Sequence, residues 1–209
     1  PKDYQDIVDD NDGNELVKIG VGSKILKNFV TESGSIAIGD KYKEDNWEVI
    51  EDIQTVDCDP ELPVFNLTVS GDRTFTANET VVHNKGDGDC FASFAPVLMA
   101  DGTRKAIIEV QIGDEVVGKD GVTNRVVGTH TADPTVRNLY GFNGHVPFVT
   151  ECHPFLTKEG WGCFEPDTFK ALKPKQYQDI VDDNDDEELV KIEEDTKILH
   201  MDGWSRVVD

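Results

Sequence analysis

The chain has 209 residues, enough for one large domain or two small ones with a buried core. Its 42 acidic and 20 basic residues give a formal net charge of −22, which repels phosphate and argues against a nucleic-acid or anionic-membrane partner. No stretch is long and apolar enough to span a bilayer, and residue 1 opens no signal peptide.

The cysteine spacing does not resemble a disulfide framework, so reduced thiols are expected in a chain of this size. Reduced cysteines without a visible signal peptide favour a cytoplasmic location. Because a mature start can be trimmed, the compartment stays open. The cysteines are Cys58, Cys90, Cys152 and Cys163.

A long repeat links the two ends of the chain. Residues 1–19 recur at 174–192 with three differences, and the match continues from 23–26 to 196–199. Trp47 opens a segment that parallels the one at Trp204, where the chain stops.

The first copy continues to Asn84 and the second has no such continuation. This pattern predicts that residues 1–84 are the C-terminal part of a module, residues 90–209 the N-terminal part of the same kind of module, and residues 85–89 a linker. A fragment of a tandem array fits this order, and so does a circular permutant with overlapping ends. Natural and engineered origins both stay open.

Short strands separated by turns are predicted along most of the chain. Ser70-Gly71-Asp72 and Gly113-Asp114 are turn signals, and the acidic runs at 9–12 and 182–188 are expected to be solvated loops. This rhythm is typical of an all-β domain of many short strands. The expected strands are 64–69, 74–77, 80–82, 96–99, 107–112 and 125–128.

Cys90 is a candidate nucleophile. A thiolate is the best side-chain nucleophile near neutral pH, and at the start of a strand it can attack the carbonyl of the preceding Asp89. The acyl group then moves from nitrogen to sulfur. Taken alone, a cysteine is more often a small buried apolar residue.

Thr150-Glu151-Cys152-His153 is a second candidate. The His153 imidazole can protonate a departing amide nitrogen, and the Thr150 hydroxyl, three residues earlier, can reach the same amide or its carbonyl. By itself this pattern is weak, since a histidine in a core or turn is commoner.

His83-Asn84 is the third candidate. An asparagine held against its own carbonyl can cyclise to a succinimide and break the chain behind it, and a preceding imidazole can donate a hydrogen bond to that carbonyl. The two bonds at risk, Asn84–Lys85 and Asp89–Cys90, lie within one short segment.

Together these motifs resemble the hedgehog/intein (Hint) family. Val64–Val69, Thr74–Asn78 and Val81–Asn84 are similar to the C-terminal end of that family, Cys90–Val116 to its N-terminal block, and Thr150–Phe155 to its Thr-x-x-His block. The order differs, because the family's end precedes its beginning here.

The resemblance implies a horseshoe-like all-β fold whose first and last residues meet at one active site, here in circularly permuted order. Residues 85–89 span up to roughly 17 Å when extended, enough to join such ends through that site. The surplus repeat copy could be exchanged with a second molecule, giving a domain-swapped homodimer. The substrate is the chain's own backbone, and no cofactor is expected.

Two departures from the family bear on activity. The family usually has a histidine where Arg73 stands; the permanently charged arginine can orient a carbonyl or stabilise an oxyanion but cannot shuttle a proton. Splicing also needs Cys, Ser or Thr after the terminal asparagine, and here that residue is Lys85. The chain is therefore expected to cleave itself rather than to splice.

Two other functional classes compete with self-processing. Calcium binding by the acidic segment Asp9–Glu15 has suitable ligand types, but no starting position gives both the alternating acids and the glycine of a helix–loop–helix site. A purely structural acidic β module would explain the repeat and the charge, but not the three motifs. Zinc could gather Cys90, His83, His153, Cys152 and Cys163, although no paired ligand spacing supports a structural site.

Overall fold

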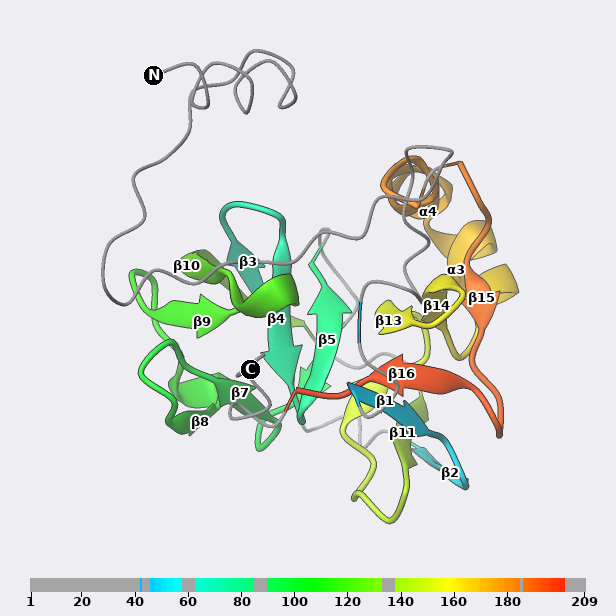
Figure 1. Ribbon diagram of the computed structural model, residues 1–209, viewed down its shortest axis with the longest axis horizontal. Helices are drawn as coiled ribbons and strands as arrows, with labels where there is room; N and C mark the ends of the chain where they lie inside the picture. Colours follow the sequence, from blue (N-terminus) through cyan, green and yellow to red (C-terminus); the bar gives the residue numbers. More distant parts are fainter. Residues whose placement is uncertain are drawn as a thin grey trace, which may run out of the picture. The chain divides into compact units, whose positions relative to one another are not determined.

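A computed structural model describes residues 42, 46–57, 63–84, 90–132, 138–184 and 186–201, all within the compact unit Ala37–Asp209. In these ranges the chain is mostly β-strand with two short α-helices, which confirms the predicted all-β class (Figure 1). The first repeat copy and the linker 85–89 lie outside the described residues.

The larger sheet of the described residues has the order β1-β16-β13-β5-β4-β7-β8, with β14 beside β13 and β15 beside β14. Its pairs are antiparallel except β14–β15, which is parallel. The strands are β1 (Trp47–Val49), β4 (Thr74–Ala77), β5 (Thr80–His83), β7 (Pro96–Leu98), β8 (Arg104–Ala106), β13 (Phe155–Thr157), β14 (Gly160–Cys163), β15 (Val190–Lys191) and β16 (Lys197–Leu199).

The second sheet of the described residues has the order β2-β11-β12-β6-β3-β10-β9. Its long pair is β3 with β10, whose register shifts between Val126 and Gly128. The strands are β2 (Ile53–Asp57), β3 (Val64–Val69), β6 (Phe91–Ala92), β9 (Glu115–Val117), β10 (Thr123–Ala132), β11 (Asn138–Phe142) and β12 (Val149–Thr150).

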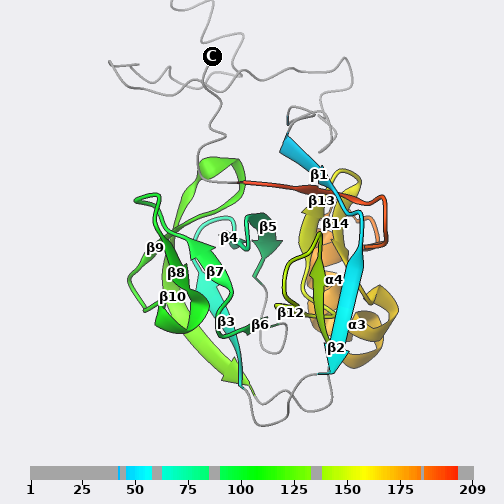
Figure 2. The same ribbon diagram turned by 90° about the horizontal axis from the view of Figure 1, so that it is seen from below.

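Both sheets combine strands that precede residues 85–89 with strands that follow them. In the larger sheet β5 pairs with β13 through Val82 and Phe155, and β1 pairs with β16 through Trp47 and Leu199. In the other sheet β3 lies between β6 and β10. Figure 2 shows β1 and β16, which are far apart in the sequence, crossing the same end of the molecule.

Two apolar clusters form the core. The first gathers β-strand side chains around Phe75, Phe91, Phe142, Phe148 and Phe155, all fully buried. The second lies under the helices and contains Trp47, Trp161 and the buried thiols of Cys152 and Cys163. Fully burying such side chains stabilises the fold by roughly 1.5–3 kcal/mol each before entropy is counted.

The helices α3 (Pro166–Leu172) and α4 (Pro174–Asp182) were not predicted. Each begins with proline at the first helical position, where the missing N–H costs nothing. Tyr177, Ile180 and Val181 have the i, i+3, i+4 spacing of one helix face and are buried in the second cluster. The prediction of a solvated loop at 182–188 is wrong in part, because Asn184 is buried.

The predicted strand at 107–112 is also wrong. Residues Ile107–Glu109 form a 3-10 turn, η2, and its Ile107 and Val110 are buried while Ile108 and Ile112 are more than half exposed. Burial thus recurs every third residue, which a turn satisfies and a strand does not. The predicted strands 64–69 and 74–77 match β3 and β4.

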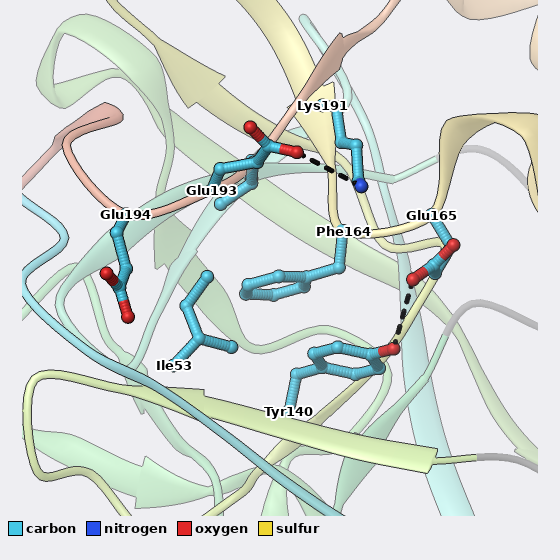
Figure 3. Close-up of a pocket in the computed structure, with 8 residues that line it drawn as sticks. Ile53, Tyr140, Phe164, Glu165, Lys191, Glu193 and Glu194 are labelled. Carbon is cyan, nitrogen blue, oxygen red and sulfur yellow. Dashed lines mark hydrogen bonds and ion pairs between the residues drawn. The ribbon is translucent and has the colours of Figure 1, made fainter.

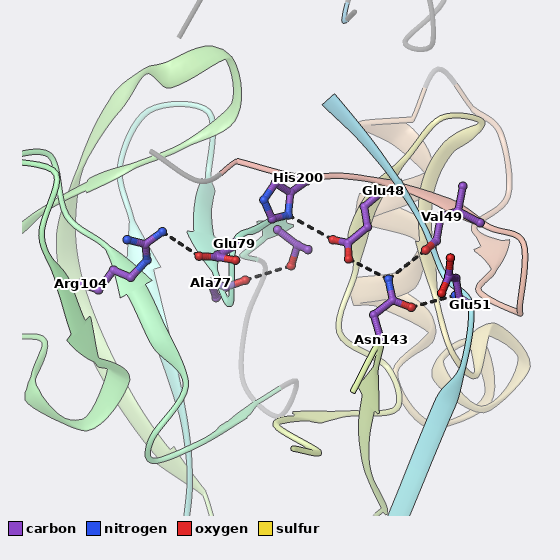
Figure 4. A network of polar contacts seen from close by, with 9 residues as sticks. Glu48, Val49, Glu51, Ala77, Glu79, Arg104, Asn143 and His200 are labelled. Carbon is purple, nitrogen blue, oxygen red and sulfur yellow. Dashed lines mark hydrogen bonds and ion pairs between the residues drawn. The ribbon is translucent and has the colours of Figure 1, made fainter. Parts of the chain in front are cut away.

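Polar contacts hold β1 against the turn after β11 and the end of β16 (Figure 4). Glu48 accepts a hydrogen bond from Asn143 at 2.7 Å and pairs with His200 at 3.1 Å. Asn143 also donates to the carbonyl of Val49 and accepts from the N–H of Glu51. These bonds fix a three-residue strand that is too short to hold its place by pairing alone.

Candidate active site

Cys90 and Thr150 are joined by two hydrogen bonds, one donated by each residue. The N–H of Cys90, the nitrogen of the Asp89–Cys90 bond, donates to the Thr150 hydroxyl at 2.9 Å. The N–H of Thr150 donates to the carbonyl of Cys90, also at 2.9 Å. Both residues are buried, so the hydroxyl is aimed at the amide nitrogen that an N–S acyl shift would release.

His153 lies in the turn that follows Thr150, whose carbonyl accepts a hydrogen bond from the N–H of His153 at 3.3 Å. Its ring is fully buried and meets the ring of Phe91, the residue after Cys90, at 4.2 Å between centroids. Phe75 and Phe155 also contact the ring. This packing fixes the imidazole near the start of β6.

The hairpin of β4 and β5 positions Arg73, His83 and Asn84. Thr74 lies opposite His83, and the N–H of Asn84 donates to the carbonyl of Arg73 at 2.7 Å. Arg73 has a left-handed backbone, φ 60°, which turns its carbonyl toward Asn84 while its side chain stays half exposed. Its main chain, rather than its guanidinium, therefore holds Asn84.

Asn84 is buried, and its side-chain nitrogen, Nδ2, has no hydrogen-bond partner within the described ranges. A buried amide nitrogen without a partner is costly, and such groups collect at functional sites. The nitrogen is also the atom that would attack the carbonyl of Asn84 during cyclisation.

One main-chain bond joins the hairpin to the Thr-x-x-His turn. The N–H of His83 donates to the carbonyl of Pro154, the residue after His153, at 3.0 Å. A continuous path of contacts thus runs from Cys90 through Thr150 and His153 to His83, Asn84 and Arg73. All six residues predicted from the sequence lie along this path, and their chemical roles remain predictions.

Asp183 contacts the site and was not predicted. Its carboxylate lies 3.2 Å from Nε2 of His83 and 3.8 Å from the Arg73 guanidinium. The ring of Trp161 meets the His83 ring edge-on at 5.0 Å. No sequence signal singles out Asp183, because the repeat preserves its acidic neighbour Asp182 as well.

A cavity of about 330 Å³ opens beside this hairpin, so water can reach the neighbourhood of His83. Charged and polar groups dominate its lining. The lining residues are Gly71, Asp72, Arg73, His83, Lys119, Trp161 and Asp183.

A second cavity, about 450 Å³, shares no residue with the predicted site (Figure 3). The rings of Tyr140 and Phe164 stack at 4.6 Å beside Ile53, and Lys191 pairs with Glu193 at 3.1 Å on its rim. Burial, followed by nearby carboxylates, raises the pKa of Tyr140. The phenol therefore stays protonated and can donate to Glu165 at 3.4 Å.

The rival ligand sites gain no geometric support in the described part of the chain. There, no three His, Cys, Asp or Glu side chains are grouped to hold a metal ion. The acidic segment Asp9–Glu15 lies outside the described residues, as does Cys58. Cys90, Cys152 and Cys163 are buried. In these ranges no helix is both long and apolar enough to cross a bilayer.

Residues 90–140 match the family model described as Hom_end-associated Hint. The match begins at Cys90 and ends in β11. A stretch of 39 residues is 49% identical to the catalytic subunit of the V-type proton ATPase of Candida tropicalis, covering 19% of this chain and 4% of that protein. The chain thus spans a small fraction of that relative's length.

Proposed function

Because the chain is a member of the Hint (hedgehog/intein) superfamily, we propose that it processes its own backbone by cleaving at Asp89–Cys90 and at Asn84–Lys85. The observation that supports this most is the reciprocal bonding of Cys90 and Thr150, which aims a buried hydroxyl at the nitrogen of one of these bonds. The start of the family match at Cys90 agrees with that residue being the first of the module.

The first reaction is an N–S acyl shift. The sulfur of Cys90 bonds to the carbonyl carbon of Asp89, the carbon–nitrogen bond breaks, and the thiol proton ends on the new amine of Cys90. Thr150 positions the departing nitrogen, and His153 carries the thiol proton to that nitrogen. Water then hydrolyses the thioester, which leaves a carboxylate on Asp89 and regenerates the thiol.

The second reaction is cyclisation of Asn84. Its Nδ2 bonds to its own carbonyl carbon, the bond to Lys85 breaks, and the proton passes to the Lys85 amine. The N–H of Asn84, held by the carbonyl of Arg73, restricts the rotation that cyclisation must overcome. His83, oriented by Asp183, assists by donating to the carbonyl under attack.

The two reactions end in cleavage rather than ligation. Lys85 follows Asn84 and provides no thiol or hydroxyl to accept the acyl group. Among the described residues, no contact favours a second candidate function.

Intact mass measured during incubation with and without a small thiol tests this proposal. We expect thiol-accelerated cleavage before Cys90 and a fragment ending in succinimide at Asn84. Cys90→Ala should abolish the first and Asn84→Ala the second. Cys163→Ala is the matched control, because it removes a buried thiol of the second core cluster that is outside the path of contacts. A chain that stays intact under both conditions contradicts the proposal.

A further inference from the structure

The segment 174–199, which contains α4, β15 and β16, covers one side of the second core cluster. Its contacts are specific. The main-chain N–H of Trp161 donates to the side-chain oxygen of Asn184 at 2.9 Å, and Leu199 lies opposite Trp47 in the β1–β16 pair. The buried residues of the segment are Tyr177, Ile180, Val181, Asn184, Leu189, Ile192, Ile198 and Leu199.

The first repeat copy, residues 1–26, matches this segment without insertion or deletion and has the same residue at every buried position. The equivalents are Tyr4, Ile7, Val8, Asn11, Leu16, Ile19, Ile25 and Leu26. Each difference between the copies falls where the second copy is exposed or half-buried, such as Gln176 and Glu187. The first copy therefore has all the side chains that this surface accepts.

The backbone of the second copy favours the sequence of the first. Asp186 and Asp195 both have left-handed backbones, with φ of 65° and 71°. The first copy has Gly13 and Gly22 at these two positions. Glycine adopts this conformation without the steric strain that a Cβ introduces. The sequence of residues 1–26 is therefore at least as compatible with the backbone of 174–199 as the sequence of 174–199 itself.

We propose that residues 1–26 are an alternative occupant of the surface covered by 174–199, and that they reach it from within the same chain. In the exchanged form Leu26 takes the place of Leu199 opposite Trp47. Residues 27–46 then need only close a loop between two adjacent strands, which a connection of this length does at small entropic cost.

Tethering favours the same-chain occupant, since it raises the local concentration of the segment far above that of a second molecule. The site survives the exchange: Asp10 replaces Asp183 at His83, and Asn11 replaces Asn184 at Trp161.

Substitutions at the equivalent buried positions Ile7 and Ile180 test the exchange. They are made in the full chain with Asn84→Ala and Cys90→Ala, which keep it intact. A buried aspartate at either position excludes that copy from the core. We expect Ile180→Asp alone and Ile7→Asp alone to shift the urea midpoint little, and the two together to abolish cooperative unfolding. Gln176→Asp, which reproduces Asp3, is the control for an added aspartate.

Hydrogen exchange read by mass spectrometry identifies the occupant. In the Ile180→Asp chain, amide protection should move from 174–199 to 1–26, and sedimentation should show a monomer at all concentrations. The proposal is overturned if Ile180→Asp alone is as damaging as both changes, or if 1–26 stays unprotected. A concentration-dependent dimer would overturn the same-chain route.

Discussion

The Thr150 hydroxyl accepts a hydrogen bond from the N–H of Cys90, and the carbonyl of Cys90 accepts one from the N–H of Thr150. Both residues are buried. The pair fixes the position of the amide nitrogen before any reaction occurs, which is how an enzyme site reduces the entropic part of a barrier.

Thr150→Ala is expected to slow thiol-dependent cleavage before Cys90 by roughly ten- to a hundredfold, since a buried N–H left without its acceptor costs about 1–3 kcal/mol. Thr150→Ser keeps the hydroxyl and should retain most of the rate. Timed intact-mass measurements give both rates. Equal slowing of the two variants would mean that the methyl group, not the hydroxyl, matters.

Asp183→Asn is expected to slow cleavage at Asn84 severalfold and to leave thioester formation unchanged, because its carboxylate contacts His83 and Arg73, which lie beside Asn84. The change is made together with Asp10→Asn, so that neither repeat copy supplies the carboxylate. Asp182→Asn, whose side chain bonds Gln178, is the control. Separate quantification of the two cleavage products by mass distinguishes the reactions.

The β1 contacts predict a pH dependence of stability. The hydrogen bond from His200 is the main cause that lowers the pKa of Glu48, with that from Asn143 adding to it against the effect of burial. A carboxyl group whose folded-state pKa is lowered stabilises the fold above its unfolded-state pKa of about 4.3, and this contribution disappears as pH falls through the lowered value.

Glu48→Gln should therefore reduce the free energy of unfolding at pH 7 by up to about 1 kcal/mol, after solvent screening of a half-buried group is considered. Its difference from the unmodified chain should shrink as the pH falls below about 4. Urea unfolding between neutral pH and about pH 3 measures this, with the exposed Glu109→Gln as control. A difference that persists at the acidic end would assign the effect to packing.

Gly141→Ala tests the packing of the second sheet. An added Cβ would lie 2.4 Å from the carbonyl oxygen of His145 and 2.9 Å from the nitrogen of Pro147, both main-chain atoms that cannot rotate away. We expect a loss of roughly 3 kcal/mol, at the upper end of overpacking costs. Gly144→Ala meets no atom within 4 Å and has only its φ of 75° to strain, so it should cost less. Thermal unfolding compares the two.

Local patterns in the sequence predicted the strands well where a turn signal bounds a short run of β-branched and aromatic residues. Val64–Val69 is followed by a turn signal at Gly71, and β3 has the predicted bounds. The prediction for Ile107–Ile112 failed because an unbroken run of apolar and long side chains fits both a strand and a turn, and only contact with Ala95 decides between them. Tyr177, Ile180 and Val181 have helical spacing, but the acidic run that follows them favoured the interpretation as a solvated loop.

Six candidate site residues could be named from the sequence, because each has a chemical reason to be present in its motif, and their roles stay predictions. They are Cys90, Thr150, His153, His83, Asn84 and Arg73. Asp183 was missed because its role depends on the turn after α4, which places one carboxylate of an acidic run against a buried ring. No local pattern distinguishes that aspartate from its neighbours.

Because both sheets combine strands from before and after residues 85–89, the cleavage products should remain associated. The pieces before and after the cut bonds share β5–β13, β3–β10 and β1–β16 ladders and a common apolar core. Losing a peptide bond removes none of those contacts. The nicked protein should elute from a sizing column as an undivided particle, and a denaturing gel would be needed to reveal its two halves.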